Sequence, residues 1–163
     1  MKKIINTFVL LFFAIVNLNA QDNIETTTVN GVEISYSLNE IPSGNHSLIG
    51  LYIGTLGTKP FKLFITKVTN NKISGYSITG NNKVSFTGIF TSTPKKYEIF
   101  KGFYSNGVTY KLKLSEPKTN NINGNFALTL DMNDTVGTEG SGTWISYNKT
   151  LNRKIILESI GHP

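Results

Sequence analysis

The sequence predicts an all-β protein, a single antiparallel up-and-down meander that is closed or nearly closed into a small barrel of about 8–10 strands. Short apolar alternations, separated by Asn, Gly, Ser, Thr and Pro clusters, run from Asn30 onward, and no stretch keeps helical spacing for three turns. The connections between them are too short for parallel crossovers, which favours antiparallel neighbours. Glycines recur just before bulky residues, which is typical of strands that coil sharply. Examples are Gly75-Tyr76, Gly88-Ile89, Gly102-Phe103, Gly124-Asn125-Phe126 and Gly142-Thr143-Trp144.

The amino-terminal residues 1–20 predict a signal peptide. A basic start at Lys2 and Lys3 precedes an apolar run from Phe8 to Val16, and Ala20 offers a cleavage site. The alternative, an uncleaved anchor, is disfavoured because a membrane span needs about 20 apolar residues. The polar residues 21–29 are expected to form a flexible lead-in, and residues 30–163 a single barrel domain.

Composition narrows the compartment and the partners. Because the chain has no cysteine, it forms no disulfide and carries no lipidated cysteine. Together with the predicted signal peptide, this leads us to expect an exported protein, periplasmic or secreted, that is not a lipoprotein and has no membrane span after signal cleavage. The net charge is +6, but the lysines are scattered and Arg153 is the sole arginine, which argues against nucleic-acid binding.

Ten strands are predicted along the barrel domain. The loop Gly80-Asn81-Asn82 and the pair Asn106-Gly107 predict tight turns, while Pro60 and Pro94 are expected at strand edges or in loops. The predicted strands cover residues 32–38, 48–56, 61–68, 73–78, 83–90, 97–104, 108–114, 121–130, 140–146 and 154–158.

Strict alternation predicts which side chains of two strands face the interior. Residues 108–114 and 121–130 each place apolar residues on one face and polar residues on the other. Gly124 and Phe126 fall on the inward face, and Asn123 falls on the face expected in water. An inward glycine suits a small closed barrel, whose strands coil across the interior.

The segment Lys72–Phe90, with two consecutive strands that each carry a glycine beside a bulky residue, and the element Gly142-Thr143-Trp144 resemble small exported meander barrels of the avidin and lipocalin kind. The resemblance implies a barrel fold. In those families the Gly-x-Trp element opens the barrel near the amino terminus, whereas here it lies near the end. The polar ligand contacts of avidins have no counterpart at matching positions, so the resemblance implies no biotin site.

Polar residues suggest little catalytic chemistry. His46 and His162 have no second ligand at usable spacing, and we expect no metal or other cofactor. Glu98 and Glu116 could meet across the sheet as a general acid and base, the arrangement of a glycan hydrolase acting on the envelope. The densest oxygen-ligand cluster is a weak metal candidate, a loop that contains Asp131, Asn133, Asp134 and Glu139.

Inward aromatic residues leave two binding hypotheses open. If the interior is filled, Phe86, Tyr110, Phe126 and Trp144 form its core. If a cavity remains, the same residues line a ligand site, with the Tyr110 hydroxyl and the Trp144 indole as orienting donors. We predict a non-enzymatic binding protein, either an inhibitor or immunity-type protein that docks on a partner through a loop such as 131–139, or a carrier of a small apolar ligand in the barrel interior.

Overall fold

The computed structural model describes residues 23–119, 123–133, 135 and 137–160, and it confirms the all-β meander barrel. The predicted signal peptide, Asp134 and His162 lie outside the described residues. The described strands are β1 (Ile24–Val29), β2 (Val32–Ser37), β3 (Gly50–Leu56), β4 (Lys59–Thr69), β5 (Lys72–Thr79), β6 (Asn82–Phe100), β7 (Phe103–Ser115), β8 (Gly124–Asn133), β9 (Gly137–Ser146) and β10 (Asn152–Ser159), with a short 3-10 helix at Leu38–Glu40.

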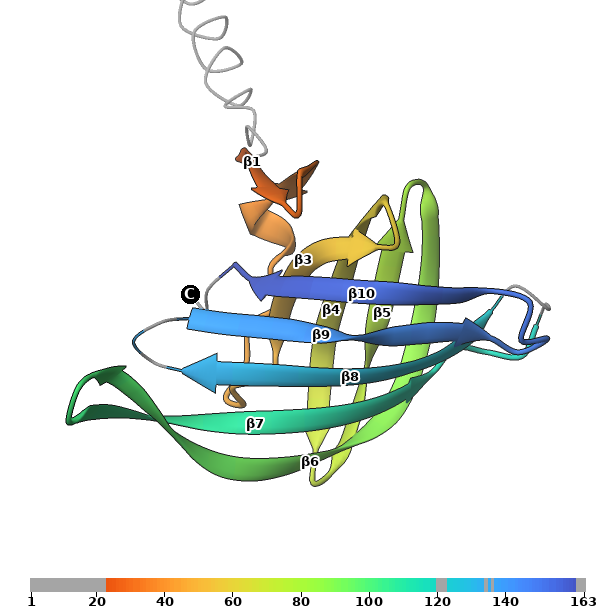
Figure 1. The fold of residues 1–163 in the computed structure, drawn as a ribbon. Helices are drawn as coiled ribbons and strands as arrows, with labels where there is room; N and C mark the ends of the chain where they lie inside the picture. Colours follow the sequence, from red (N-terminus) through yellow and green to blue (C-terminus); the bar gives the residue numbers. More distant parts are fainter. Residues whose placement is uncertain (1–22, 120–122, 134, 136, 161–163) are drawn as a thin grey trace, which may run out of the picture.

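Eight strands close the barrel in the order β10-β3-β4-β5-β6-β7-β8-β9. Every neighbouring pair is antiparallel, and β10 returns to pair with β3 (Figure 1). In this last pair Leu157 lies opposite Gly54. Closure matters because it pairs both edges of the sheet. The middle of the barrel is filled. Its interior is packed with buried apolar side chains that include Leu63, Ile65, Phe86, Leu112, Leu114, Leu128, Leu130 and Ile155.

The predicted strand over residues 97–104 is wrong. Phe100 and Phe103 flank a turn at Lys101-Gly102, where Gly102 has a φ of 85°, and β6 and β7 form one long hairpin around it. Pro94 lies within β6, and Ser105-Asn106-Gly107 belongs to β7 rather than to a turn. The pairing of β5 with β6 ends at Ile89 and that of β8 with β7 at Gly107. Residues 91–106 therefore extend beyond their neighbours, and we call them the projecting hairpin (Figure 1).

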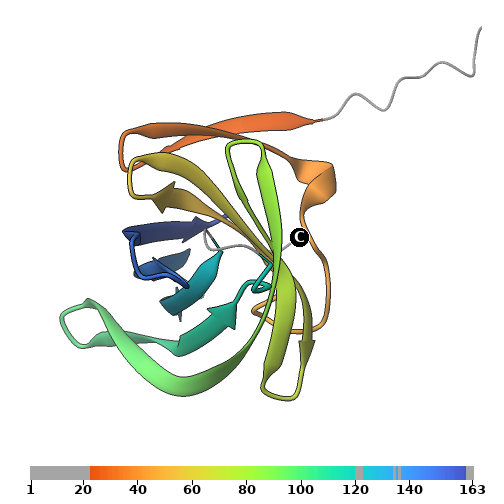
Figure 2. The same cartoon turned by 90° about the vertical axis from the view of Figure 1, so that its right-hand side faces the viewer.

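The expected lead-in is in large part a strand. Ile24–Val29 forms β1, which pairs with β2 through a turn at Asn30-Gly31 whose φ angles are 50° and 75°. This hairpin packs on the outside of the barrel, where Figure 2 shows it lying across the early strands. Because β3 and β4 are covered by this hairpin on one side and face the interior on the other, β3 is apolar along nearly its whole length. The contact residues are Val29, Ile34, Tyr36, Leu51, Ile53 and Phe64.

One end of the barrel is closed by the segment that precedes β3. Leu48 is fully buried, the Ser47 hydroxyl is 2.8 Å from the Tyr110 hydroxyl, and the His46 ring packs edge-on against Phe90 with centroids 5.5 Å apart. The His46 Nδ1 also accepts a hydrogen bond from the Leu48 amide. This segment covers one end of the barrel, and the cavity considered below lies at the opposite end. Within the described ranges, no helix has the length and hydropathy to cross a membrane.

Candidate functional site at the open end of the barrel

A cavity of ≈ 290 Å³ occupies the end of the barrel opposite the closed one, and we call this end the open end. Strands β3 and β4 turn there, as do β5 and β6, and β7 and β9 finish there. The walls are formed by the buried rings of Phe61, Phe126 and Trp144. The exposed side chains of Lys59, Asn82 and Arg153 form the rim. The remaining lining residues are Leu56, Ser77, Thr79, Val84, Glu116, Asn123 and Leu151.

Glu116 is the one buried carboxylate of the described interior. Its Oε2 accepts hydrogen bonds from the Gly124 amide at 2.7 Å and from the Trp144 Nε1 at 3.1 Å. The backbone of Glu116 is also held, because its amide donates to the Gly124 carbonyl and its carbonyl accepts from the Tyr147 hydroxyl. Glu116 thereby fixes the Trp144 indole and joins the ends of β7, β8 and β9.

Burial raises the pKa of Glu116 above its ordinary value of 4.5, and the hydrogen bonds from Gly124, Trp144 and Ser77 offset only part of this effect. The folded protein therefore holds this proton more tightly than the unfolded chain. The stability that protonated Glu116 contributes is complete below pH 4.5 and is lost as the pH rises through the folded pKa.

We expect the wild-type protein to lose unfolding free energy relative to Glu116→Gln as the pH is raised from 4.5 toward neutrality. Glutamine keeps an oxygen that accepts from Gly124 and Trp144 but does not titrate. Urea unfolding of both proteins across this range measures the difference. Asp131 does not interfere, because its pKa is lowered from 3.8, so it titrates below this pH range, and it is present in both proteins. Two parallel stability curves would show that Glu116 is not desolvated.

The rim carries positive charge without a counterion. Arg153 lies on β10 at the same inward parity as Ile155 and Leu157, and its stem passes Gly57. Within the described part of the chain the only ion pair joins Lys95 and Asp131, so neither Lys59 nor Arg153 is neutralised by a described acidic side chain. The open end therefore combines apolar walls and the buried Glu116 carboxyl with two cations that form no ion pair with a described residue.

The structure divides the residues that the sequence suggested as a ligand site. Phe126 and Trp144 line the cavity. Phe86 lies deeper, with its ring centroid 6.5 Å from that of Phe126. Tyr110 lies at the closed end, where its hydroxyl is hydrogen-bonded to that of Ser47. Trp144 is thus the only one of the two expected donors at the cavity, and its Nε1 already donates to Glu116.

Sequence reasoning missed Glu116 and Arg153 as members of the cavity. The signal for both was present, since each continues an inward alternation. Glu116 follows Tyr110, Leu112 and Leu114, and Arg153 precedes Ile155 and Leu157 at the same spacing. A charged residue at an inward position beyond the last apolar one marks the end of the packed core.

Glu98 and Glu116 do not meet. Glu98 lies near the tip of the projecting hairpin, opposite Tyr104 on β7, and accepts from the Gly102 amide. Tyr104 lies near the start of β7 and Glu116 directly follows its end, a separation of about 40 Å at the usual rise of a strand. This pair cannot act as the acid and base of a glycan hydrolase.

Two side chains of the weak metal-site candidate, Asp131 and Asn133, make other contacts, and Asp134 lies outside the described residues. The Asp131 carboxylate accepts from Thr109 and forms an ion pair with Lys95 at 3.3 Å. These two contacts, with Thr109 the stronger, lower the pKa of Asp131. The Asn133 Oδ1 accepts from the Thr135 amide at 2.7 Å, and Glu139 lies opposite Asp131 on β9. Among the described residues, no three His, Cys, Asp or Glu side chains gather as metal ligands.

Comparison of the chain with protein-family models, with curated proteins and with solved structures finds no match.

Proposed function

We propose that the chain is an exported, non-enzymatic barrel that binds a small amphiphilic anion at its open end. The observation that carries this proposal is the cavity itself, whose apolar walls lie below the uncompensated Lys59 and Arg153. An apolar body between Phe61, Phe126 and Trp144 removes surface from water, and an anionic group pairs with the rim. Pockets of this kind, apolar with a few placed polar groups, are the usual form of small-molecule sites.

The size of the cavity limits the ligand. A volume of ≈ 290 Å³ is at the lower end of the range for ligand pockets and corresponds to that of about ten water molecules in the liquid. The filled middle of the barrel excludes a long ligand that threads the interior. The ligand class is therefore a short aliphatic or single-ring carboxylate rather than a long-chain lipid.

Two parts of the proposal, export and a non-enzymatic role, are supported by different observations. The signal-peptide pattern of residues 1–20 supports a periplasmic or secreted protein, and the lack of cysteine argues against a lipid anchor on a cysteine. Glu116 supports binding rather than catalysis, since its hydrogen bonds to Gly124 and Trp144 give it a structural role and the described lining residues include no second carboxylate. The barrel architecture supports the resemblance to avidins and lipocalins, small barrels that take ligands at an open end.

The inhibitor or immunity-type interpretation receives less support at the loop that suggested it. Asp131 and Asn133 make hydrogen bonds within the protein and do not form a free recognition loop. Docking of the surface on a macromolecule is a separate property and is considered below for the projecting hairpin.

The proposal predicts saturable binding of small carboxylates with one site per chain. The chain from Gln21 is titrated with octanoate and benzoate, and with octanol and benzyl alcohol as uncharged counterparts. Emission of Trp144, the only tryptophan, is the readout. The acids should bind more tightly than the alcohols, and Arg153→Gln should weaken acid binding about tenfold, the effect of about 1.4 kcal/mol.

Lys154→Gln is the matched control, because Lys154 is exposed on the outward face of the same strand. It removes the same charge from the chain and should leave the affinity unchanged. The proposal fails if no acid gives a saturable response, or if Arg153→Gln and Lys154→Gln weaken binding equally.

A further inference from the structure

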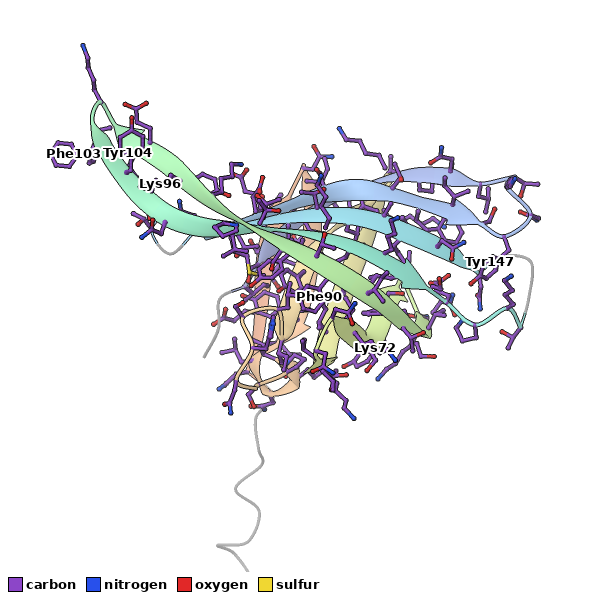
Figure 3. The ribbon with its side chains drawn as sticks, turned by 90° about the horizontal axis from the view of Figure 1, so that it is seen from below. Lys72, Phe90, Lys96, Phe103, Tyr104 and Tyr147 are labelled. Carbon is purple, nitrogen blue, oxygen red and sulfur yellow. The ribbon has the colours of Figure 1, made fainter. Side chains whose placement is uncertain are left out.

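The projecting hairpin ends in aromatic side chains that have no place in the barrel. Phe100, Phe103 and Tyr104 are 70%, 69% and 62% exposed, the largest values for aromatic residues in the described chain. The Phe100 and Phe103 rings contact each other edge-on, with centroids 6.1 Å apart, across the turn. Figure 3 shows Phe103, Tyr104 and Lys96 on the part of the hairpin that stands away from the barrel. Clustered exposed rings of this kind mark an interaction site.

The root of the hairpin is fixed, so the tip is held away from the barrel. Lys95 on β6 forms an ion pair with Asp131 on β8, and its ammonium lies 4.5 Å from the centroid of the Tyr97 ring. On β7, the Ser105 hydroxyl donates to Asn133. From Lys95 to Phe100 the strand advances by a distance of about 17 Å. The rings are therefore presented at the end of a supported arm.

The charges around the tip are predominantly positive. Lys96 and Lys101 are exposed, and neither forms an ion pair with a described residue. The one acidic side chain of the tip, Glu98, accepts from the Gly102 amide inside the turn. Aromatic rings with flanking lysines are the composition that suits the boundary between lipid headgroups and acyl chains.

The edge of the hairpin argues against strand addition by a second copy of the chain. Beyond Phe90, whose amide donates to the Asn71 carbonyl, β6 pairs with no described strand on its β5 side. That edge carries Pro94, Lys95 and Lys96, and proline and lysine at a free edge disfavour pairing with another strand. The tip therefore acts through its side chains.

We propose that the tip of the projecting hairpin docks on a lipid surface that carries anionic headgroups. Phe100 and Phe103 enter the interfacial region, Tyr104 stays at headgroup level, and Lys96 and Lys101 contact the anionic groups. A convex tip of three rings is small compared with the roughly 800 Å² that each partner buries in a specific protein interface. A lipid surface needs no complementary shape, so it fits this tip better than a protein does. A chain docked in this way lies on the membrane surface, and its tip does not span the membrane.

The test is co-sedimentation of the chain from Gln21, which contains all described strands, with two kinds of vesicle. One kind is phosphatidylcholine alone, and the other is equal parts phosphatidylcholine and phosphatidylglycerol. We expect binding to the second kind, weakened about fivefold for each of Lys96→Gln and Lys101→Gln. The double variant Phe100→Ala/Phe103→Ala should lose at least tenfold in partitioning, since burial of each ring contributes that much.

The control is Ile89→Ala/Ile145→Ala, which removes two exposed apolar side chains from the body of the barrel. It should bind vesicles like the wild type. A second readout is Phe103→Trp, whose new indole should be quenched by brominated lipid, whereas the buried Trp144 of the wild type should not be.

Three results would overturn the proposal. They are equal vesicle binding by the tip and control variants, no binding by the wild type, and self-association of the wild type that the tip variant abolishes. The last result would assign the tip to an interface between copies of the chain. Ligand titration at the open end, followed by Trp144 emission, should be unchanged in Lys96→Gln, Lys101→Gln and Phe100→Ala/Phe103→Ala, so failure here is distinguishable from failure of the proposed function.

Discussion

Trp144→Ala is expected to lower the unfolding free energy by about 3–5 kcal/mol. Trp144 is 7% exposed and packs beside Phe126 at the wall of the open end. Removing the indole enlarges a cavity that already exists and takes one hydrogen-bond donor from the buried Glu116. Both effects act in the same direction, because the cavity loses packing and the carboxylate loses part of its compensation for burial.

Urea unfolding followed by circular dichroism measures this loss, since the variant has no tryptophan to report. Trp144→Phe separates the two effects, because it retains most of the packing and loses only the Nε1 hydrogen bond, at a cost of about 1.5–3 kcal/mol. Ile145→Ala, at the neighbouring outward position, is the control and should cost clearly less than Trp144→Ala, because Ile145 is 40% exposed and donates no hydrogen bond to Glu116. Equal stability of Trp144→Ala and Ile145→Ala would contradict the buried position of the indole.

Gly124→Val is expected to destabilise the barrel by about 1–3 kcal/mol or more, because the site has no room for a side chain. A Cβ at Gly124 would lie 2.2 Å from the Ile145 carbonyl oxygen and 2.9 Å from Cε2 of Trp144. The first of these atoms belongs to the paired backbone of β9 and cannot move without breaking the ladder. The substitution should also displace Trp144, and with it the wall of the cavity.

Asn125→Val is the control for Gly124→Val, since Asn125 points outward on β8 and is exposed. It should shift the stability by no more than about 0.5 kcal/mol. Asn123 is unsuitable, because the expectation that it faces water is wrong. It is 5% exposed, and its side-chain amide donates to the Pro117 carbonyl at 2.7 Å. Similar melting temperatures for Gly124→Val and Asn125→Val would show that the inward assignment of Gly124 is incorrect.

The errors in the predicted elements come from sequence patterns that can be interpreted only when the pairing strand is known. The segment 97–104 alternates well enough for a strand, and Lys101-Gly102 looks like another coil point of the sheet. In the structure the same glycine adopts a positive φ and reverses the chain. The opposite error occurred at Ile24–Val29, whose polar sequence gives no sign of a core face. It becomes a strand because β2 pairs with it and Val29 packs against the barrel.

The amino-acid sequence alone determined the fold class, the antiparallel meander and the inward face of the strands that carry Phe86, Tyr110, Phe126 and Trp144. These follow from local properties, namely side-chain alternation, short connections and turn residues, which act between near neighbours along the chain. Only the tertiary structure decided that the barrel is filled in the middle, closed at the Tyr110 end and open at the Trp144 end. It also brought Glu116, which directly follows β7, to Trp144 on β9, and it set the length by which the hairpin extends beyond its neighbouring strands. The physical reason is that closure and register join residues far apart in sequence, and no local pattern encodes which of them meet.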